Sequence, residues 1–384
     1  MDAFYVEVER RRDPSLIGKP VAVGGTGPRG VIASASYEAR RHGVHSAQST
    51  VGALKVCRDL MVVPPSHGRY AEVSADVFEV FRGFTPHVEG LSLDEAFLDV
   101  SGLRKHFTSP VEVAMAIRGE IRSRLGLPAS VGVASSKFLA KLASEEAKPD
   151  GWFHVPKDSQ LEFLHALAVE SLWGVGPATL AGLQRLGVVT VRDLAELPDE
   201  SVLRALGPAN GRHLLDLARG IDPRPVIGDS EAKSISVEET YDRDLEGRKT
   251  VETALLAHAQ SLSGRLRRSG MAARTVTVKV RYQDFTTITR SVTLGSPVDS
   301  PRDLYQAGGN LLGSVDLTRP VRLLGLGGSA LEPGDEPRQL DLGADADWVK
   351  VSQAVAEVRE KFGEHLVEPA RLLEQDGQDR ESDR

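Results

Sequence analysis

The sequence has few of the features that mark secreted or membrane proteins. Its 384 residues include a single cysteine, Cys57, which excludes an internal disulfide. No apolar run approaches the roughly 20 residues of a membrane-spanning helix, and no signal peptide precedes the first motif. We therefore expect a cytoplasmic protein that is not inserted in a membrane, with Cys57 as a small core residue. A chain of this length should form two or more domains.

Charge is distributed unevenly along the chain. The net charge is −7, but residues 331–384 alone carry −8, so the remainder is close to neutral. Residues 233–322 have a local excess of +4. An acidic tail behind a mildly basic body is compatible with DNA binding through local patches.

Two adjacent acidic residues, Asp94 and Glu95, interrupt the otherwise apolar segment 91–99. Neighbouring residues on a regular strand point to opposite faces, so both carboxylates can serve one site only where the backbone bends, at a hairpin or a bulge. Acidic groups among apolar residues are costly unless cations neutralise them. The pair therefore favours a hard cation, above all Mg²⁺ with phosphate groups. Two solvated turn acids are the alternative interpretation.

Short strands and helices alternate in the first half of the chain. We expect strands in residues 21–25, 31–35 and 129–134, an acidic hairpin in residues 89–100, and helices that start near residue 36 and cover residues 70–84 and 110–125. This alternation predicts a mixed α and β arrangement around one sheet.

Short helices separated by Gly and Pro follow residue 161. Residues 172–188 resemble a helix-hairpin-helix, in which the turn at Gly174 and Gly176 would expose the first amides of the next helix to a backbone phosphate. An ordinary helical hairpin is the alternative. A degenerate second copy is expected to begin at Gly207.

A separate α+β domain is predicted after a small, polar linker. Its expected elements are a helix in residues 251–269 and strands in residues 274–281, 286–294 and 321–327. The strands carry Lys279, Arg281 and Arg290, which would either contact DNA phosphates or belong to a solvated sheet face.

Seven motifs, taken in order, resemble the Y-family DNA polymerases, specifically the bacterial DNA polymerase IV branch. They are residues 2–9, 35–40, 92–97, 135–141, 147–151, 173–176 and 233–238, and the resemblance extends from residue 2 to about residue 373. It implies an α+β multidomain, right-hand polymerase. The implied parts are a palm (1–11 and 66–158), small fingers (12–65), a helix-hairpin-helix thumb (159–228), a linker (229–236), an α+β little-finger DNA-binding domain (237–330), a C-terminal segment (331–373) and a disordered tail (374–384).

The resemblance implies low-fidelity, template-directed extension of a primer with dNTPs across damaged DNA. Asp94 and Glu95 match the family's catalytic metal ligands, so two Mg²⁺ ions are expected as cofactors. Tyr37 and Arg40, one helical turn apart, match residues that grip the triphosphate, as does Lys148. The expected partners are primer–template DNA and dNTPs, and the protein is expected to be monomeric.

Further roles follow from the same resemblance. Tyr5 aligns with the steric gate that would exclude a ribose 2′-hydroxyl. A roof of small residues above the nascent base pair is expected from Val31, Ala33 and Ser34. DNA phosphate contacts are expected from Gly174, Gly176, Lys279, Arg281 and Arg290. A peptide that holds the sliding clamp is expected at Gln339, Leu340 and Leu342, although packing against a following helix, residues 348–363, would also explain these leucines.

The match breaks at the beginning of the chain. The family's first metal-ligand Asp lies two residues before the position of Asp2, and here the chain begins at Met1. We expect the natural start to lie upstream, with Met1 an internal residue of an Asp-Met-Asp motif. Otherwise Asp2 substitutes poorly as a metal ligand, or the protein has lost catalysis and Asp2 is a solvated terminal acid.

Two other classes of protein compete with the polymerase. A catalytically impaired or N-terminally truncated homologue would bind primer–template DNA without efficient extension. A nuclease with a helix-hairpin-helix would also use paired carboxylates, but it would degrade the primer and leave Tyr5, Tyr37 and Arg40 unexplained. Metal-dependent incorporation of dNTPs separates the three.

Overall fold

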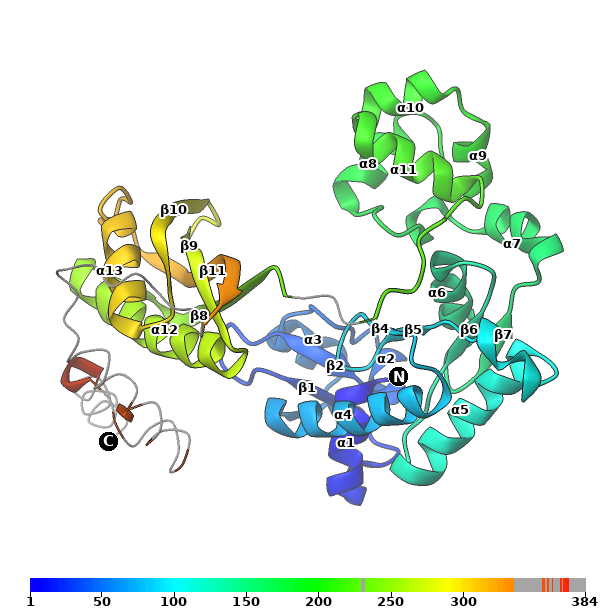
Figure 1. Cartoon of the computed structure of the whole chain (residues 1–384), viewed down its shortest axis with the longest axis horizontal. Helices are drawn as coiled ribbons and strands as arrows, with labels where there is room; N and C mark the ends of the chain where they lie inside the picture. Colours follow the sequence, from blue (N-terminus) through cyan, green and yellow to red (C-terminus); the bar gives the residue numbers. More distant parts are fainter. Residues whose placement is uncertain are drawn as a thin grey trace. The chain divides into compact units, whose positions relative to one another are not determined.

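The computed structural model describes residues 1–228 and 232–334, together with a few residues between 354 and 372. The chain divides into two compact units, Met1–Ser230 and Glu231–Arg384 (Figure 1). Most of the helix expected in residues 348–363 lies outside the described residues, as do the expected clamp peptide (Gln339, Leu340 and Leu342) and the tail 374–384. Among the described residues, no helix is both long enough and apolar enough to cross a membrane.

The first unit begins with a helix and a small sheet. Its elements are α1 (Phe4–Arg12), β1 (Val21–Gly24), β2 (Ile32–Ala35), α2 (Tyr37–Arg40), α3 (Thr50–Val56) and β3 (Met61–Val63). The strand order is β2-β1-β3, with β1 antiparallel to β2 and parallel to β3. Cys57 is buried in the core shared by this sheet and its helices, as expected.

Two longer helices and two strand pairs complete the part that carries the acidic motif. They are α4 (His67–Phe84), β4 (Val88–Gly90), β5 (Ala96–Leu98), α5 (Pro110–Leu125), β6 (Val131–Val133), α6 (Lys137–Glu146) and β7 (Trp152–His154). The expected hairpin and the expected helices are confirmed, and Ser109 caps α5 by accepting a hydrogen bond from the Glu112 amide at 3.2 Å.

The expectation of one sheet in this half is wrong. The described residues form three separate sheets there, β2-β1-β3, β4-β5 and β6-β7. Strands β4 and β5 are antiparallel, whereas β6 and β7 are parallel. Strands β4 to β7 have only three residues each, and strands this short can be recognised from the sequence while their partners cannot.

The remainder of the first unit is helical, as predicted. It contains α7 (Gln160–Ala166), α8 (Pro177–Gln184), α9 (Val191–Glu196), α10 (Asp199–Leu206) and α11 (Pro208–Ala218). Short 3-10 helices in this unit are Pro14–Leu16, Ser101–Lys105, Lys157–Ser159 and Val169–Ser171. Both α8 and α11 start with a Gly-Pro pair, which supports the idea of two related hairpins.

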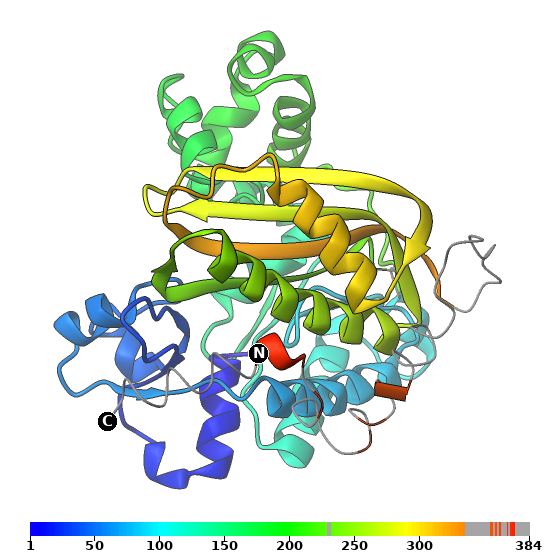
Figure 2. The same ribbon diagram turned by 90° about the vertical axis from the view of Figure 1, so that its left-hand side faces the viewer.

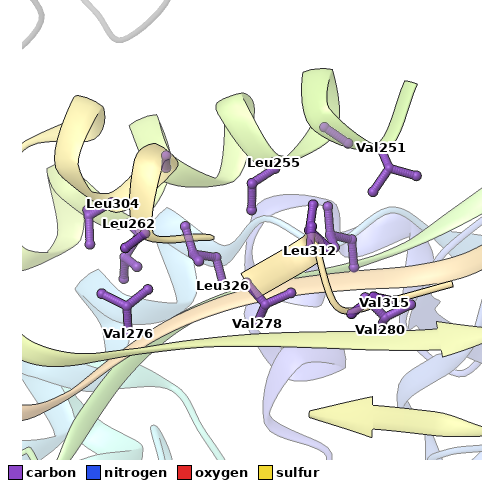
Figure 3. Packing of buried hydrophobic residues seen from close by; sticks show 14 of the residues in the cluster. Val251, Leu255, Leu262, Val276, Val278, Val280, Leu304, Leu312, Val315 and Leu326 are labelled. Atoms are coloured by element: carbon purple, nitrogen blue, oxygen red, sulfur yellow. The ribbon is translucent and has the colours of Figure 1, made fainter. Parts of the chain in front are cut away.

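The described residues of the second unit form one antiparallel sheet with two helices on one face (Figure 2). Its elements are β8 (Ser234–Leu245), α12 (Arg248–Arg268), β9 (Met271–Tyr282), β10 (Thr287–Val298), α13 (Pro301–Leu312) and β11 (Val321–Pro333), with strand order β10-β9-β11-β8. Apolar residues of both helices pack on one side of the sheet, where Leu255, Leu262 and Leu304 meet Val276 and Leu326 (Figure 3). The opposite face has no helix over it among the described residues.

Candidate active site

The acidic pair lies at the turn of the β4–β5 hairpin. Residues 91–95 leave the strand pattern, and the amide of Leu91 donates to the Glu95 carbonyl at 2.8 Å to close the turn. The hydroxyl of Ser92 donates to Asp94 Oδ1 at 2.9 Å, and that of Ser74 donates to the Leu93 carbonyl at 2.5 Å. The bend expected from the sequence is therefore present, and it frees the two carboxylates from strict alternation.

Each carboxylate faces a fixed positive charge. The terminal amine of Met1 donates to the Asp94 carbonyl at 2.9 Å and lies 3.6 Å from Asp94 Oδ2. Lys141 of α6 donates to Glu95 Oε1. Partial burial acts to raise the pKa of Glu95, but the hydrogen bond and the charge of Lys141, helped by the terminal amine, outweigh it and lower this pKa below its ordinary value. Both acids are partly exposed, so the motif is less buried than its apolar neighbours suggested.

The expected phosphate ligands Tyr37 and Arg40 share one face of α2. The guanidinium carbon of Arg40 lies 4.8 Å from the centre of the Tyr37 ring. Arg40 Nε donates to the Ala35 carbonyl at 3.0 Å, which anchors the guanidinium at its base. Burial, reinforced by the negative charge of Asp2, raises the pKa of Tyr37, so its hydroxyl stays protonated at neutral pH.

Lys148 lies in the same cavity as the acidic pair. A cavity of about 860 Å³ is lined by Asp94, Glu95 and Lys148. The ammonium group of Lys148 donates to both carboxylate oxygens of Glu145 at 2.8 Å. An ion pair at a partly exposed position is weak, so this lysine can exchange Glu145 for a phosphate at little cost.

Asp2 is buried, so the interpretation of it as a solvated terminal acid is wrong. The residue is 2% exposed, and its Oδ2 accepts hydrogen bonds from the Ser130 hydroxyl and the Asp150 amide, both at 2.7 Å. Its Oδ1 and the Tyr37 hydroxyl are buried without a hydrogen-bond partner among the described residues. Asp2 thus ties α1 to the loop between α6 and β7, and one of its oxygens remains able to accept a hydrogen bond.

The ring of Tyr5 is supported by a second tyrosine that the sequence did not reveal. Tyr5, in α1, stacks on Tyr70 of α4 with ring centres 4.2 Å apart and planes 12° from parallel. The fully buried Tyr70 donates its hydroxyl to Glu9 Oε1 at 2.7 Å, and burial raises the pKa of Tyr70 to about 12. The one signal for this arrangement is the spacing of Tyr5 and Glu9, which are four residues apart and so on one helix face.

The three residues of the expected roof do not all face the same way. Val31, which immediately precedes β2, is 49% exposed, and Ala33, two positions further along, is also exposed. Ser34 is 7% exposed, because alternation along the strand turns it to the opposite, buried side. Val31 and Ala33 therefore form the exposed surface by themselves.

Two glycines shape the turn of the helix-hairpin-helix and leave space around it. Gly174 has a backbone φ of +99°, a conformation that residues other than glycine rarely adopt. Gly176 caps α8, and a Cβ at Gly176 would meet no atom within 4 Å. The backbone amides at the start of α8 are thus reachable by a large anion such as a phosphodiester.

The register of the second sheet separates the three basic residues expected to contact DNA. Thr289 pairs with Lys279 and Thr287 with Arg281. These four residues therefore lie on the face of the sheet opposite α12 and α13, which we call the open face. Arg290 pairs with Val278, which is buried under the helices, and so it lies on the other face at the edge strand. Arg290 is therefore on the opposite face from Lys279 and Arg281, and its expected contact with DNA stays a prediction.

The open face of the second sheet is rich in hydroxyl groups. Gly325 and Gly327 of β11 lie between two strands that carry small or polar side chains. The hydroxyl groups on this face come from Ser234, Ser236, Thr275, Thr277, Thr289, Ser291 and Thr293. Lys279 bridges the face by donating to Glu238 Oε2 at 2.7 Å, and Arg281 Nε donates to the Thr287 hydroxyl at 2.9 Å. Such a face can approach a sugar–phosphate backbone closely.

The described residues contain no cluster of three or more His, Cys, Asp or Glu side chains able to hold a metal ion. Asp94 and Glu95 are two oxygen donors side by side at a turn, and both are compensated by nearby cations. This donor set fits a hard divalent ion that takes its other ligands from substrate phosphates and water.

Comparison with known proteins agrees with this arrangement. Residues 1–145 match the impB/mucB/samB family, and residues 232–342 match the C-terminal domain of the same family. The DNA polymerase IV of Desulfatibacillum aliphaticivorans is 42% identical in an alignment of 383 residues that covers 97% of this chain and 95% of that protein. The chain belongs to the Y-family DNA polymerases.

Other relatives and solved structures support the same family assignment. The DNA polymerase IV of Streptomyces coelicolor is 45% identical over 86% of this chain and 70% of its own length. A solved Y-family polymerase chimera of Dbh and Dpo4 matches with a TM-score of 0.80 at 25% identity, covering 86% of this chain and 97% of the chimera. An insertion ternary complex of Dbh DNA polymerase matches with a TM-score of 0.63. The expected fold class and family are confirmed, and the protein is a DNA-directed DNA polymerase of the translesion class.

Proposed function

We propose that Asp94 and Glu95 hold the two Mg²⁺ ions with which this polymerase extends a primer. The observation that carries this proposal is the placement of two carboxylates at one turn, each facing a cation, Met1 or Lys141. Two carboxylates side by side offer a divalent cation two oxygen ligands, and the ion would take the place of the amines that neutralise them here. Bound there, Mg²⁺ would supply Lewis-acid activation for the primer 3′-hydroxyl and would neutralise charge on the departing pyrophosphate.

The triphosphate of an incoming dNTP would be held from the side of α2. Arg40 offers a planar guanidinium whose Nε is already anchored on the Ala35 carbonyl, so little side-chain entropy is lost when its outer nitrogens bind phosphate. The protonated hydroxyl of Tyr37 donates a further hydrogen bond. Lys148, released from Glu145, adds positive charge from the other side of the cavity.

Tyr5 would select the sugar of the nucleotide. Its ring cannot easily turn aside, because it stacks on Tyr70, which Glu9 fixes by a hydrogen bond. A rigid ring beneath the sugar would exclude the 2′-hydroxyl of a ribonucleotide by steric contact. Above the base pair, the small exposed surface of Val31 and Ala33 would leave room for damaged template bases.

Primer–template DNA would bind through its phosphates. The turn at Gly174 and Gly176 offers backbone amides, and the open sheet face offers Lys279, Arg281 and hydroxyl groups. Such contacts are largely independent of sequence and sensitive to salt. We further propose that the protein acts as a monomer that is recruited to the sliding clamp by Gln339, Leu340 and Leu342, for which the sequence motif is the support.

Primer extension with dNTPs and Mg²⁺ tests the catalytic assignment. Replacing the pair by Asp94→Ala/Glu95→Ala should reduce the rate by about a thousandfold or more, because several kcal/mol of transition-state stabilisation are lost. The variant Asp158→Ala/Glu162→Ala, which removes two exposed acids elsewhere in the same unit, should extend primers normally. If the unchanged chain binds primer–template without extending it, the protein is the non-catalytic DNA-binding homologue instead.

A further inference from the structure

The turn between β9 and β10 holds an aromatic residue in an unfavourable backbone conformation. Residues 283–285 form a short loop, in which the Phe285 amide donates to the Tyr282 carbonyl and the Tyr282 amide donates to the Thr286 carbonyl, both at 3.0 Å. The last residue of such a loop has a left-handed conformation, for which glycine is the usual choice. Here that residue is Phe285, with φ of +65°. Strain of this kind points to a function of the side chain.

Packing does not explain the choice of phenylalanine. Phe285 is 63% exposed and does not belong to the apolar core that the described residues of the second unit form. A single exposed apolar residue is ordinary by itself. One that is also strained is not, because the fold gains little from its ring in return.

Arg322 reaches this ring from an irregularity in β11. The residues on either side of Arg322 pair with consecutive residues of β9, so Arg322 is an extra residue without a partner in the ladder. A bulge of this kind redirects a side chain. The guanidinium carbon of Arg322 lies 4.8 Å from the centre of the Phe285 ring. Two local departures from regular structure thus bring these two side chains together.

Positive charge without a carboxylate partner gathers around the loop. The guanidinium of Arg322 forms no hydrogen bond or ion pair within the described part of the chain. Arg281 of the open face donates only to the hydroxyl of Thr287, the first residue after the loop region, at 2.9 Å. Arg319 donates to Asp284 at 2.7 Å and so neutralises the one carboxylate of the loop. Arg281 and Arg322 are therefore available to an anion.

An exposed ring beside free guanidinium groups matches a nucleotide whose base is unpaired. The ring offers a stacking surface, and the guanidinium nitrogens offer donors to the phosphates on either side of the base. Bases within a duplex are covered on both faces by their neighbours, so only an unpaired base can present a face to Phe285. An apolar pocket of a protein partner would accept the ring but would leave the two arginines unused.

We propose that Phe285 and Arg322 form a stacking site for one unpaired base of single-stranded DNA, next to the open face. The contact is independent of sequence, because every base has a flat aromatic face. This inference rests on the proposed binding of DNA phosphates by the open face. It adds a contact that distinguishes single-stranded from double-stranded DNA, which phosphate contacts alone do so only weakly.

Binding titrations of the full chain with three labelled probes test this proposal. The first probe is a primer–template with a 5′ template overhang of about ten thymidine nucleotides. The second is the same duplex with blunt ends, and the third has an overhang of abasic nucleotides. Phe285→Gly removes the ring and suits the backbone conformation. Phe285→Trp keeps an aromatic face, and Phe285→Leu keeps apolar volume without one.

Phe285→Gly and Phe285→Leu should weaken binding of the thymidine overhang by about fivefold or more. Their affinities for the blunt and abasic probes should equal those of the unchanged chain, and Phe285→Trp should bind all three probes normally. The melting temperature of Phe285→Gly should be unchanged or higher, because the strain is relieved. Arg322→Met should also weaken binding of the thymidine overhang.

Unchanged binding of the thymidine overhang by Phe285→Gly would overturn the proposal and leave the ring to a protein partner. An equal loss on the thymidine and abasic overhangs would also overturn it, because the contact would then not involve a base. So would a melting temperature lowered by several degrees in Phe285→Gly, which would make the ring a packing residue. The blunt duplex tests the open face separately: a failure of that assignment would appear as unchanged blunt-duplex binding in Lys279→Ala/Arg281→Ala, whatever the ring does.

Discussion

Glu95 combines a structural contact with its proposed catalytic role. Lys141 reaches it from α6, and the pKa of Glu95 is lowered because this contact and the terminal amine outweigh the effect of burial. A group whose pKa is lower in the folded state stabilises the fold above its unfolded pKa. That contribution is lost as the pH falls through the lower, folded value. The acidic site therefore also contributes to the stability of the unit that contains it.

Lys141→Met should remove this contribution in a pH-dependent way. The loss in free energy of unfolding relative to the unchanged chain should be fully present at pH 7 and should shrink as the pH falls below the ordinary glutamate value of about 4.3. Urea unfolding between pH 3 and pH 7 measures it. Lys157→Met, at an exposed position, should show no such dependence. A loss for Lys141→Met that is constant across this range would show that Lys141 acts through packing alone.

Tyr5→Ala should open the site to ribonucleotides. Without the ring beneath the sugar, incorporation of an rNTP relative to its dNTP should rise at least tenfold, or about 1.4 kcal/mol in discrimination. Tyr5→Phe keeps the ring and its stacking on Tyr70 and should remain selective. Single-nucleotide incorporation kinetics on one primer–template give both ratios. An unchanged ratio in Tyr5→Ala would exclude Tyr5 as the gate.

The roles of single residues were predictable where the residues belong to a local sequence motif. They were not predictable where contacts between distant parts of the chain position the side chain. Asp94, Glu95, Tyr37 and Arg40 lie in recognisable local patterns, and the structure puts each pair together. The support of Tyr5 by Tyr70 joins α1 to α4 across some 65 positions, and no sequence pattern encodes that contact.

At the scale of elements, periodic segments were predictable and weakly patterned ones were not. Helix α5 begins and ends as expected because Ser109 caps it and Gly126 follows it with φ of +64°. Strand β8 was missed because acidic and hydroxyl residues dominate it, and it is a strand through its pairing with β11. Helix α13 was missed because two glycines weaken its pattern. The division of the sheet beside the acidic hairpin depends on which edges meet, a property that a local pattern cannot show.

The contact of α6 with β6 gives a prediction at this scale. Gly132→Ala should destabilise the first unit by about 1–3 kcal/mol, since the new methyl group would overlap the backbone of α6 at Ala140 and Ser144. Gly119→Ala, on the exposed side of α5 with nothing within 4 Å, should instead be neutral or stabilising by up to about 1 kcal/mol. Thermal or urea unfolding of the two variants provides the comparison. Equal effects would show that α6 can move away from β6.

At the scale of the whole molecule, catalysis and much of the DNA binding are assigned to different units. The acidic pair belongs to Met1–Ser230, and the open sheet face belongs to Glu231–Arg384. Substitutions in one unit should therefore leave the activity assigned to the other unit measurable. The Asp94→Ala/Glu95→Ala chain should still bind primer–template DNA, because its phosphate contacts are elsewhere.

The converse variant, Lys279→Ala/Arg281→Ala, should weaken DNA binding while sparing the chemical step. Each lost phosphate contact should reduce the slope of log K against log salt by about 0.9, so the double variant should lose about 2. At saturating DNA its rate of nucleotide addition should match that of the unchanged chain. Arg290→Ala is the matched control, since Arg290 lies on the opposite face of the sheet and its loss should leave the slope almost unchanged. Titrations of labelled primer–template at several salt concentrations measure the slopes. An equal change for Arg290→Ala would mean that DNA binding reflects the net charge of the second unit and not its open face.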